Sequence, residues 1–205
     1  MNVEHESDVL ILGIGNLLWA DEGFGVRVVE SLHRRYRLPD SVKVMDGGTQ
    51  GLYLLPYVQG AKRLLIFDAI DYGLKPGTMK TVRDAEVPRF TGAKKMSLHQ
   101  TGFQDVLSAA ELLGDVPEAM LLIGVQAELL DDWGGSLTET ISAQIDSAVD
   151  LGVQQLHSWG IEVKPREDRL SAEAGVLRYG LEREGYEWRE QPIPLMETID
   201  RLMGE

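Results

Sequence analysis

The sequence contains no cysteine, and this absence excludes disulfides, zinc sites built on thiolates and a cysteine nucleophile. Any metal ion that the chain contacts must therefore be held by His, Asp or Glu side chains.

Basic residues are outnumbered, since 20 Lys and Arg stand against 33 Asp and Glu, for a formal net charge of −13. Such a chain repels phosphate backbones and anionic lipid headgroups, so neither nucleic acid nor a membrane is expected as a partner. No apolar run reaches the roughly 18 residues of a spanning helix. The N-terminal MNVEHESDVL lacks the basic and apolar regions of a signal peptide, and we expect a cytoplasmic protein.

What the chain does contain is typical of a folded globular protein, with 43% hydrophobic and 26% charged residues. Short apolar runs, three of them followed directly by Gly or Asp, alternate with segments of helical periodicity. These runs are Val9–Leu12, Val42–Met45, Leu64–Phe67 and Met120–Val125. The alternation predicts an α/β fold, a three-layer sandwich in which helices cover both faces of a twisted, mostly parallel sheet.

The length favours one α/β domain, which we place at residues 1–164. Helices are expected directly after Glu22, over Leu52–Tyr57, after His99 and from Thr138 to Gly160, the last being the longest, and Thr78–Val82 is expected as an edge strand. Residues 165–205 are expected to form a charged C-terminal tail with a short docking helix, whose apolar positions are Met196, Ile199, Leu202 and Met203.

The turn Gly13-Ile14-Gly15-Asn16 begins like a dinucleotide-binding fingerprint, but Leu18 stands where its third glycine belongs. Asp21 and Glu22 follow where phosphates would lie, and carboxylates repel phosphate. A nucleotide site stays open as an alternative because Asp46, after the second strand, resembles the acid that binds ribose. Otherwise, the glycines indicate positive φ angles and a close chain reversal over the C-terminal edge of the sheet.

Acidic residues follow three of the expected strands, on the edge where open α/β sheets place their chemistry. Glu22 comes after the first strand, Asp46 after the second and Asp68 after the third, while His99 precedes a helix that begins at the same edge. Taken singly, each residue is explained by a turn, a helix cap or a solvated side chain. Together they form a set of carboxylates and an imidazole that suits a divalent cation.

With these segments placed, the sequence resembles the hydrogenase maturation endopeptidases, which process the large subunit of nickel-iron hydrogenases. The resemblance covers residues 7 to 164 and is carried by Leu12-Gly13-Ile14-Gly15-Asn16, Asp21-Glu22, Gly25-Val26-Arg27, Asp46-Gly47-Gly48-Thr49, Asp68-Ala69, His99-Gln100 and Asp105-Val106-Leu107. It implies a hydrolase that removes a C-terminal extension from the large-subunit precursor after nickel insertion. It also implies that Glu22, Asp68 and His99 contact the metal.

From this resemblance we expect Glu22, Asp68 and His99 to be catalytic residues that bind nickel carried by the precursor, with Asp46 as a candidate base or a support for the ligands. The protein would be an endopeptidase of the aspartic or metal-dependent type. The metal would either polarise the scissile carbonyl or activate a water, and both remain open. The alternative from another class is a non-catalytic nickel-binding assembly chaperone with the same ligands.

Other hydrolase types fit the sequence poorly. It has no H-E-x-x-H motif, and Gly134-Gly135-Ser136-Leu137-Thr138 lacks the last glycine of a nucleophile elbow. A triad of Ser97, His99 and Asp68 would place the serine and its base only two residues apart, which is poor geometry for proton transfer. Leu17, Leu18 and Trp19 are expected either to form a hydrophobic lip for the substrate or to pack in the core.

Overall fold

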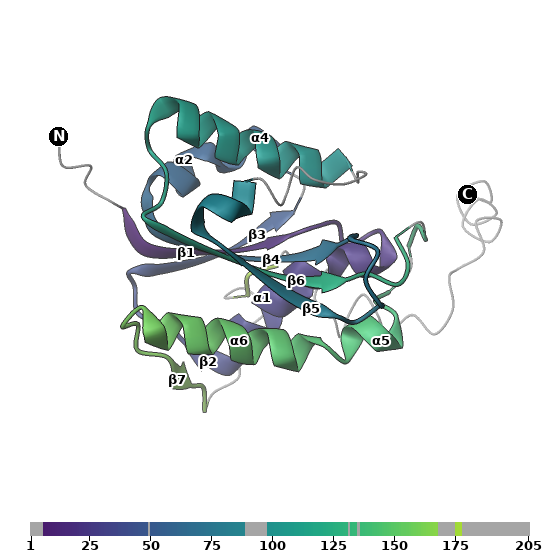
Figure 1. The fold of residues 1–205 in the computed structure, drawn as a ribbon. Coiled ribbons are helices and arrows are strands. Elements are labelled where there is room, and N and C mark those ends of the chain that lie inside the picture. Colours follow the sequence, from purple (N-terminus) through teal and green to yellow (C-terminus); the bar gives the residue numbers. More distant parts are fainter. Residues whose placement is uncertain are drawn as a thin grey trace, which may run out of the picture.

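The computed structural model describes residues 6–48, 50–88, 98–130, 132–134, 136–167 and 175–177, with only the backbone course for residues 98–101. A five-stranded sheet in the order β3-β1-β4-β6-β5 forms its centre (Figure 1). The strands are β1 Ser7–Ile14, β3 Val42–Gly48, β4 Ala61–Ile70, β5 Met79–Arg83 and β6 Ala119–Gln126. All neighbours are parallel except β5, which pairs antiparallel with β6 at one edge.

Side-chain alternation along the strands divides the core into two apolar clusters, one on each face of the sheet. In β1, Val9 and Ile11 belong to one cluster, and Leu10 and Leu12 belong to the other. Because both faces are covered, the strands read as nearly continuous apolar runs. This confirms the predicted α/β sandwich.

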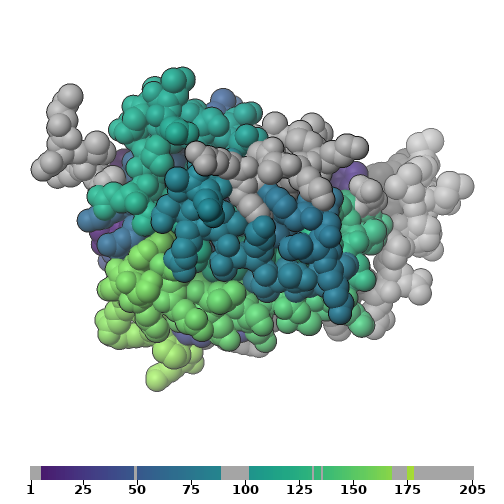
Figure 2. Space-filling view, viewed as in Figure 1, coloured from purple at the N-terminus to yellow at the C-terminus, as the bar shows by residue number. Residues whose placement is uncertain are grey.

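Helices complete the two outer layers (Figure 1). They are η1 Ala20–Gly23, α1 Phe24–Arg35, η2 Gly51–Leu54, α2 Leu55–Gln59, η3 Asp84–Glu86, α4 Leu98–Leu113, α5 Glu139–Ser142 and α6 Ile145–Ser158. Apolar residues of α1, α5 and α6 belong to the first cluster, and those of α2 and α4 belong to the second. Figure 2 shows the antiparallel edge of the sheet, around β5, on the surface between the two helical layers.

The expected helix from Thr138 to Gly160 is instead two helices, α5 and α6, and the longest described helix is α4. The break comes at Gln144, whose N–H bonds to Ile141 O at 3.0 Å, an i to i−3 bond that tightens the turn. Ile141 and Ile145 both stay buried, because four residues still bring the chain back to the same side. The predicted N-cap is confirmed, since Thr138 Oγ1 accepts from Ile141 N at 3.4 Å.

A second, two-stranded sheet was not predicted from the sequence. β2 Tyr36–Arg37 pairs antiparallel with β7 Lys164–Pro165, which joins the end of α1 to the chain after α6. Two-residue strands leave no readable alternation in the sequence. The expected apolar set at residues 196–203 lies outside the described residues. Within the described residues, no helix has both the length and the apolarity needed to cross a membrane.

Gly25 is the position where α1 lies closest to the sheet, and its substitution tests that contact. A Cβ on this residue would lie 2.2 Å from Phe67 O and 2.4 Å from Ile14 O, both backbone atoms of strands. We expect Gly25→Ala to destabilise the fold by about 3 kcal/mol, because neither oxygen can move without disturbing its strand. Urea unfolding of Gly102→Ala is the control, since the nearest atom there is Gly51 Cα at 3.5 Å. Equal stabilities for the two variants would contradict the close packing.

Candidate active site at the carboxyl ends of the strands

The glycine turn after β1 folds the chain back over the sheet edge. Gly15 has a φ of +130°, and a Cβ there would lie 1.8 Å from Glu22 O. Gly13 is needed for a different reason. It does not have a positive φ, but a Cβ at this position would lie only 2.4 Å from Gly25 O. The space next to this turn is thus filled by the backbone of η1 and α1. As a result, Glu22 in η1 is only 9% exposed.

Glu22 and Asp68 form a pair of buried acids at this edge. Asp68, near the end of β4, is 6% exposed. Burial raises the pKa of Asp68 well above its usual value, a hydrogen bond from the Ala69 backbone opposes this rise, and the negative charge of Glu22 adds to it. Two neighbouring buried carboxylates are stabilised only if they share a proton or a cation. The structure therefore brings together two of the residues proposed to contact a metal.

Tyr72 is a neighbour of this pair that the sequence analysis missed. Burial, and next the negative charge of Asp68, raise the pKa of the Tyr72 phenol to about 12, so it stays protonated at neutral pH. Its backbone N–H donates to Gln126 Oε1 at 2.7 Å, and Leu74 N–H donates to the same oxygen at 3.1 Å. Gln126 thereby fixes the loop after β4. The available signal was the short separation of Tyr72 from Asp68 in the sequence.

Asp46 lies at the same edge of the sheet but on a different strand and face. Gly13 pairs with Asp46 on one side and with Phe67 on the other, so β1 separates Asp46 from β4 by two strand spacings, about 10 Å. Alternation places Asp46 with Val44 on the α1 face, and Asp68 with Ile66 on the α4 face. The two acids share an edge of the sheet, but their side chains alternate to opposite faces, and this separates them.

His99 lies in the first turn of α4, and its side chain is outside the described residues, as is Ser97. One turn further on, a Cβ at Gly102 would lie 3.5 Å from Gly51 Cα, in the segment that follows β3. The start of α4 therefore lies at the carboxyl end of the sheet, on the face toward which Asp68 alternates. Among the side chains that the structure describes, no three His, Cys, Asp or Glu groups are placed to hold a metal ion.

Asp21, adjacent to Glu22, has a structural role. Its side chain is 0% exposed, and its carboxylate accepts four hydrogen bonds. The donors are Thr138 N at 2.7 Å, Leu129 N at 2.8 Å, Glu128 N at 3.0 Å and Thr138 Oγ1 at 3.2 Å. A buried carboxylate with this many donors is well compensated. Asp21 thus ties η1, and Glu22 with it, to the segments that flank the loop after β6.

Two tryptophans join the same elements at the surface. The rings of Trp19 and Trp133 meet edge to face with centroids 5.1 Å apart, and Gly134 N–H donates to Leu18 O at 2.7 Å. Trp133 is 65% exposed, while Trp19, Leu17 and Leu18 are half-buried. The expected lip residues are therefore neither core nor fully open surface. They border the segment that carries Glu22.

Comparison with known proteins gives one consistent result. Residues 26–155 match the model of the hydrogenase maturation protease family. The hydrogenase expression/formation protein HupD of Bradyrhizobium diazoefficiens is 57% identical, over 90% of this chain and 96% of that protein. The hydrogenase 2 maturation protease of Escherichia coli is 45% identical, over 78% and 96%. The solved hydrogenase maturating endopeptidase HybD from E. coli superposes with a TM-score of 0.74 at 43% identity, over 78% of this chain and 98% of that one.

The hydrogen bonds of Asp21 predict a large effect for a nearly isosteric change. Asp21→Asn would turn an amide NH2 toward a backbone N–H that now donates to the carboxylate, which leaves a buried donor unsatisfied. We expect a loss of about 3 kcal/mol in the free energy of unfolding. Urea denaturation measures it, with Asp132→Asn on the exposed part of the same loop as the control. If both variants unfold at the same urea concentration, the assigned role of Asp21 is wrong.

The raised pKa of Asp68 predicts that Asp68→Asn is more stable than the wild type at neutral pH. In the unfolded chain this carboxyl ionises near its ordinary pKa of 3.8, and in the folded chain it ionises only at higher pH. The wild type therefore loses stability as the pH rises above 3.8 until the folded-state pKa is passed, and an asparagine does not titrate. The difference in melting temperature should be small near pH 4 and grow toward pH 7. The exposed Asp150→Asn should show no such trend.

Proposed function

Because the chain belongs to the hydrogenase maturation protease family, we propose that it removes the C-terminal extension of a nickel-iron hydrogenase large-subunit precursor after nickel has been inserted. Hydrogenase maturation endopeptidases act on large-subunit precursors, so the precursor is also the partner. The observation that carries the proposal is the buried pair of Glu22 and Asp68: burial raises the pKa of Asp68, and the negative charge of Glu22 adds to this rise. This pair lies where α/β sheets place their active sites.

Nickel is the cargo of the precursor and serves as the recognition signal. Bringing a divalent cation to Glu22 and Asp68 would replace their repulsion with attraction, and this gain exists only for a metal-loaded substrate. His99, from the start of α4, would supply an imidazole nitrogen. Carboxylate oxygen and imidazole nitrogen are suitable donors for Ni²⁺. Cleavage would then depend on prior insertion of the metal.

The residues of this chain would position the scissile bond and donate or accept protons next to it. Glu22 and Asp68 would fix the metal, and with it the attached substrate, against the sheet edge. Tyr72 lies close enough to Asp68 for the negative charge of Asp68 to add to the effect of burial on the pKa of the phenol, which is protonated and neutral at neutral pH. Asp46, on β3 and on the other face of the sheet from Asp68, would be the base only for a substrate that reaches across this edge. A metal held by Glu22, Asp68 and His99 would act as a Lewis acid on the scissile carbonyl or lower the pKa of a bound water.

The net charge of the chain bears on its partners and its compartment. With a net charge of −13, the protein repels nucleic acid and anionic membrane surfaces, and we propose that it acts in the cytoplasm without either.

A processing assay tests the function. The purified protein is incubated with nickel-loaded and with nickel-free large-subunit precursor, and the product masses are measured. We expect loss of a C-terminal peptide from the loaded form only. Cleavage of both forms would show that nickel is not the signal. Cleavage of neither form, with nickel still bound to this protein, would indicate the assembly chaperone instead.

The ligand role of Glu22 is tested in the same assay by Glu22→Gln. Its amide keeps the shape of the side chain but removes the negative charge, and we expect processing to fall by about 100-fold or more while the circular dichroism spectrum is unchanged. Glu128→Gln is the matched control, because Glu128 is an exposed acid on the adjoining loop. Full activity of Glu22→Gln would remove Glu22 from the site.

A further inference from the structure

An apolar patch lies beside Glu22, where the loops that follow β1 and β6 meet at one end of the sheet (Figure 1). Trp133 is 65% exposed and Leu129 is 41% exposed, while Leu18 and Trp19 are half-buried. We call these four residues the tryptophan lip. Large apolar side chains that are grouped on a surface mark an interaction site, whereas single ones scattered over it do not.

Hydrogen bonds and ring packing hold the two loops together, so the lip is formed before any partner binds. Trp19 and Trp133 form an antiparallel bridge, and Gly134 N–H donates to Leu18 O at 2.7 Å. The two indole rings meet at 82°, an edge-to-face arrangement that is favourable for aromatic pairs. Because the lip is already ordered, a ligand that binds to it loses little free energy in fixing its side chains.

The backbone between the lip and Glu22 is strained. Ala20 has a φ of +35°, in the left-handed region that residues with a Cβ seldom adopt, and it is 2% exposed. Conformations of this kind cluster at functional sites, where the surrounding structure enforces them. On either side of Ala20, Trp19 O accepts a hydrogen bond from Glu22 N–H at 2.9 Å. The lip and one proposed contact to the metal therefore belong to a single fixed turn.

A bound peptide can reach both parts of this turn at once. Trp19 and Glu22 are three residues apart in the chain, so their Cα atoms are separated by at most about 11 Å. An extended peptide covers the same distance with three or four residues, at about 3.3 Å for each. A substrate whose metal lies at Glu22 would therefore place residues close to the scissile bond on the lip.

Charge disfavours two other occupants of the lip. Glu128 and Asp132, which flank it in the sequence, are exposed acids, and the whole chain has a net charge of −13. A second copy of the chain would bring like charges together, and an anionic membrane surface would be repelled in the same way.

The reaction itself favours the C-terminal extension of the precursor as the occupant. In the proposed function the nickel stays with the mature subunit, so the metal anchors only that side of the scissile bond. The extension carries no metal, and it needs a contact of its own if the scissile bond is to be held in one orientation. An exposed, preformed aromatic pair next to the metal contacts can supply this second anchor.

Building on the proposed function, we propose that the tryptophan lip binds an apolar side chain of the precursor's C-terminal extension. The contacts of Glu22 and Asp68 to the metal hold one side of the scissile bond, and the indole of Trp133 holds the other. The lip thereby determines specificity, because it favours extensions that carry an apolar residue close to the scissile bond.

Binding of nickel-free precursor isolates the lip from metal recognition. Titrations compare the wild type and Trp133→Ala with two partners, the nickel-free precursor and the same large subunit without its extension. We expect Trp133→Ala to weaken binding of the precursor by about tenfold or more, as truncation of an aromatic anchor typically does, and to leave binding of the shortened subunit unchanged. Trp133→Tyr keeps an aromatic ring and should restore much of the affinity. Leu112→Ala, at an 88% exposed leucine of α4, is the matched control and should have no effect.

The processing assay distinguishes docking from a structural effect on Glu22. With nickel-loaded precursor, Trp133→Ala should raise KM by a similar factor, and circular dichroism verifies that the variant is folded. Replacing the apolar residues of the extension with serine should raise KM for the wild type as well. It should also remove the difference between the wild type and Trp133→Ala, since the effects of two groups in contact are not additive.

The outcomes separate the lip from the proposed function. No change in affinity for Trp133→Ala, an equal loss for both forms of the subunit, or a loss of activity confined to kcat would overturn the role of the lip. Failure of the wild type to bind the nickel-free precursor would overturn it too. Failure of the wild type to cleave any precursor would contradict the proposed function, whereas the binding comparison would still decide whether the lip holds the extension.

Discussion

The contact between α1 and the sheet is made by backbone atoms, and the position of Glu22 depends on it. Gly13 and Gly25 lie against backbone oxygens at distances that no side chain would allow, and Gly15 does the same for the carbonyl of Glu22 itself. Because all three contacts involve main-chain atoms, the geometry cannot adjust through rotamer changes. The turn therefore sets where η1 lies, and with it the distance between Glu22 and Asp68.

The two adjacent acids in η1 show how this rigid turn is used. Asp21 accepts four hydrogen bonds, and its burial is compensated within the chain. Glu22 instead adds its negative charge to the burial that raises the pKa of another acid, Asp68. One acid stabilises the loop architecture, and the other adds to an unfavourable charge arrangement that the rest of the fold must support. Natural proteins break local rules of this kind mainly at functional sites.

The sequence predicted the fold because its signals are local. Apolar runs and the acids that follow them predicted β1, β3, β4 and β6 and the edge at which the acids meet. It missed what depends on tertiary geometry. Asp46 and Asp68 lie on opposite faces because of strand alternation. The role of Asp21 depends on donors more than 100 residues away. The break before α6 comes from one hydrogen bond that spans three residues instead of four. None of these can be read from the chain as a periodic pattern, because strands that are covered on both faces are apolar at nearly every position.

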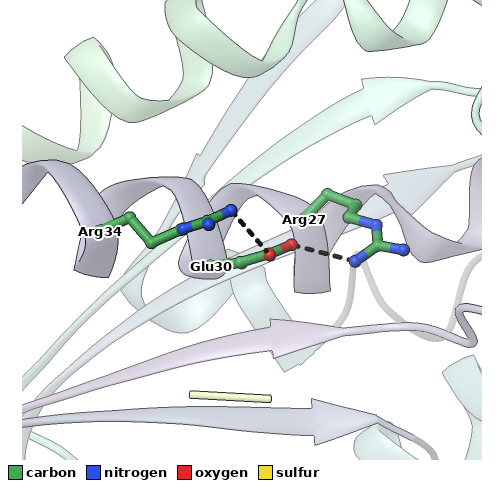
Figure 3. Close-up of polar contacts among 3 residues, drawn as sticks. All are labelled: Arg27, Glu30 and Arg34. Carbon is green, nitrogen blue, oxygen red and sulfur yellow. Dashed lines mark hydrogen bonds and ion pairs between the residues drawn. The ribbon is translucent and has the colours of Figure 1, made fainter. Parts of the chain in front are cut away.

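The burial of Glu30 and Arg27 extends the same reasoning to the other side of α1. On its sheet side the helix is held by contacts that require the absence of side chains, whereas on its outer side Arg27 and Glu30 form a buried ion pair (Figure 3). Replacing a buried ion pair by apolar residues often leaves a protein as stable or more so, so this pair adds little net stability. Removing one partner, in contrast, would leave the other charge buried and uncompensated. The two sides of α1 are therefore held in different ways: the glycine contacts fix the distance of the helix from the sheet, and the ion pair holds two buried charges together on the opposite side.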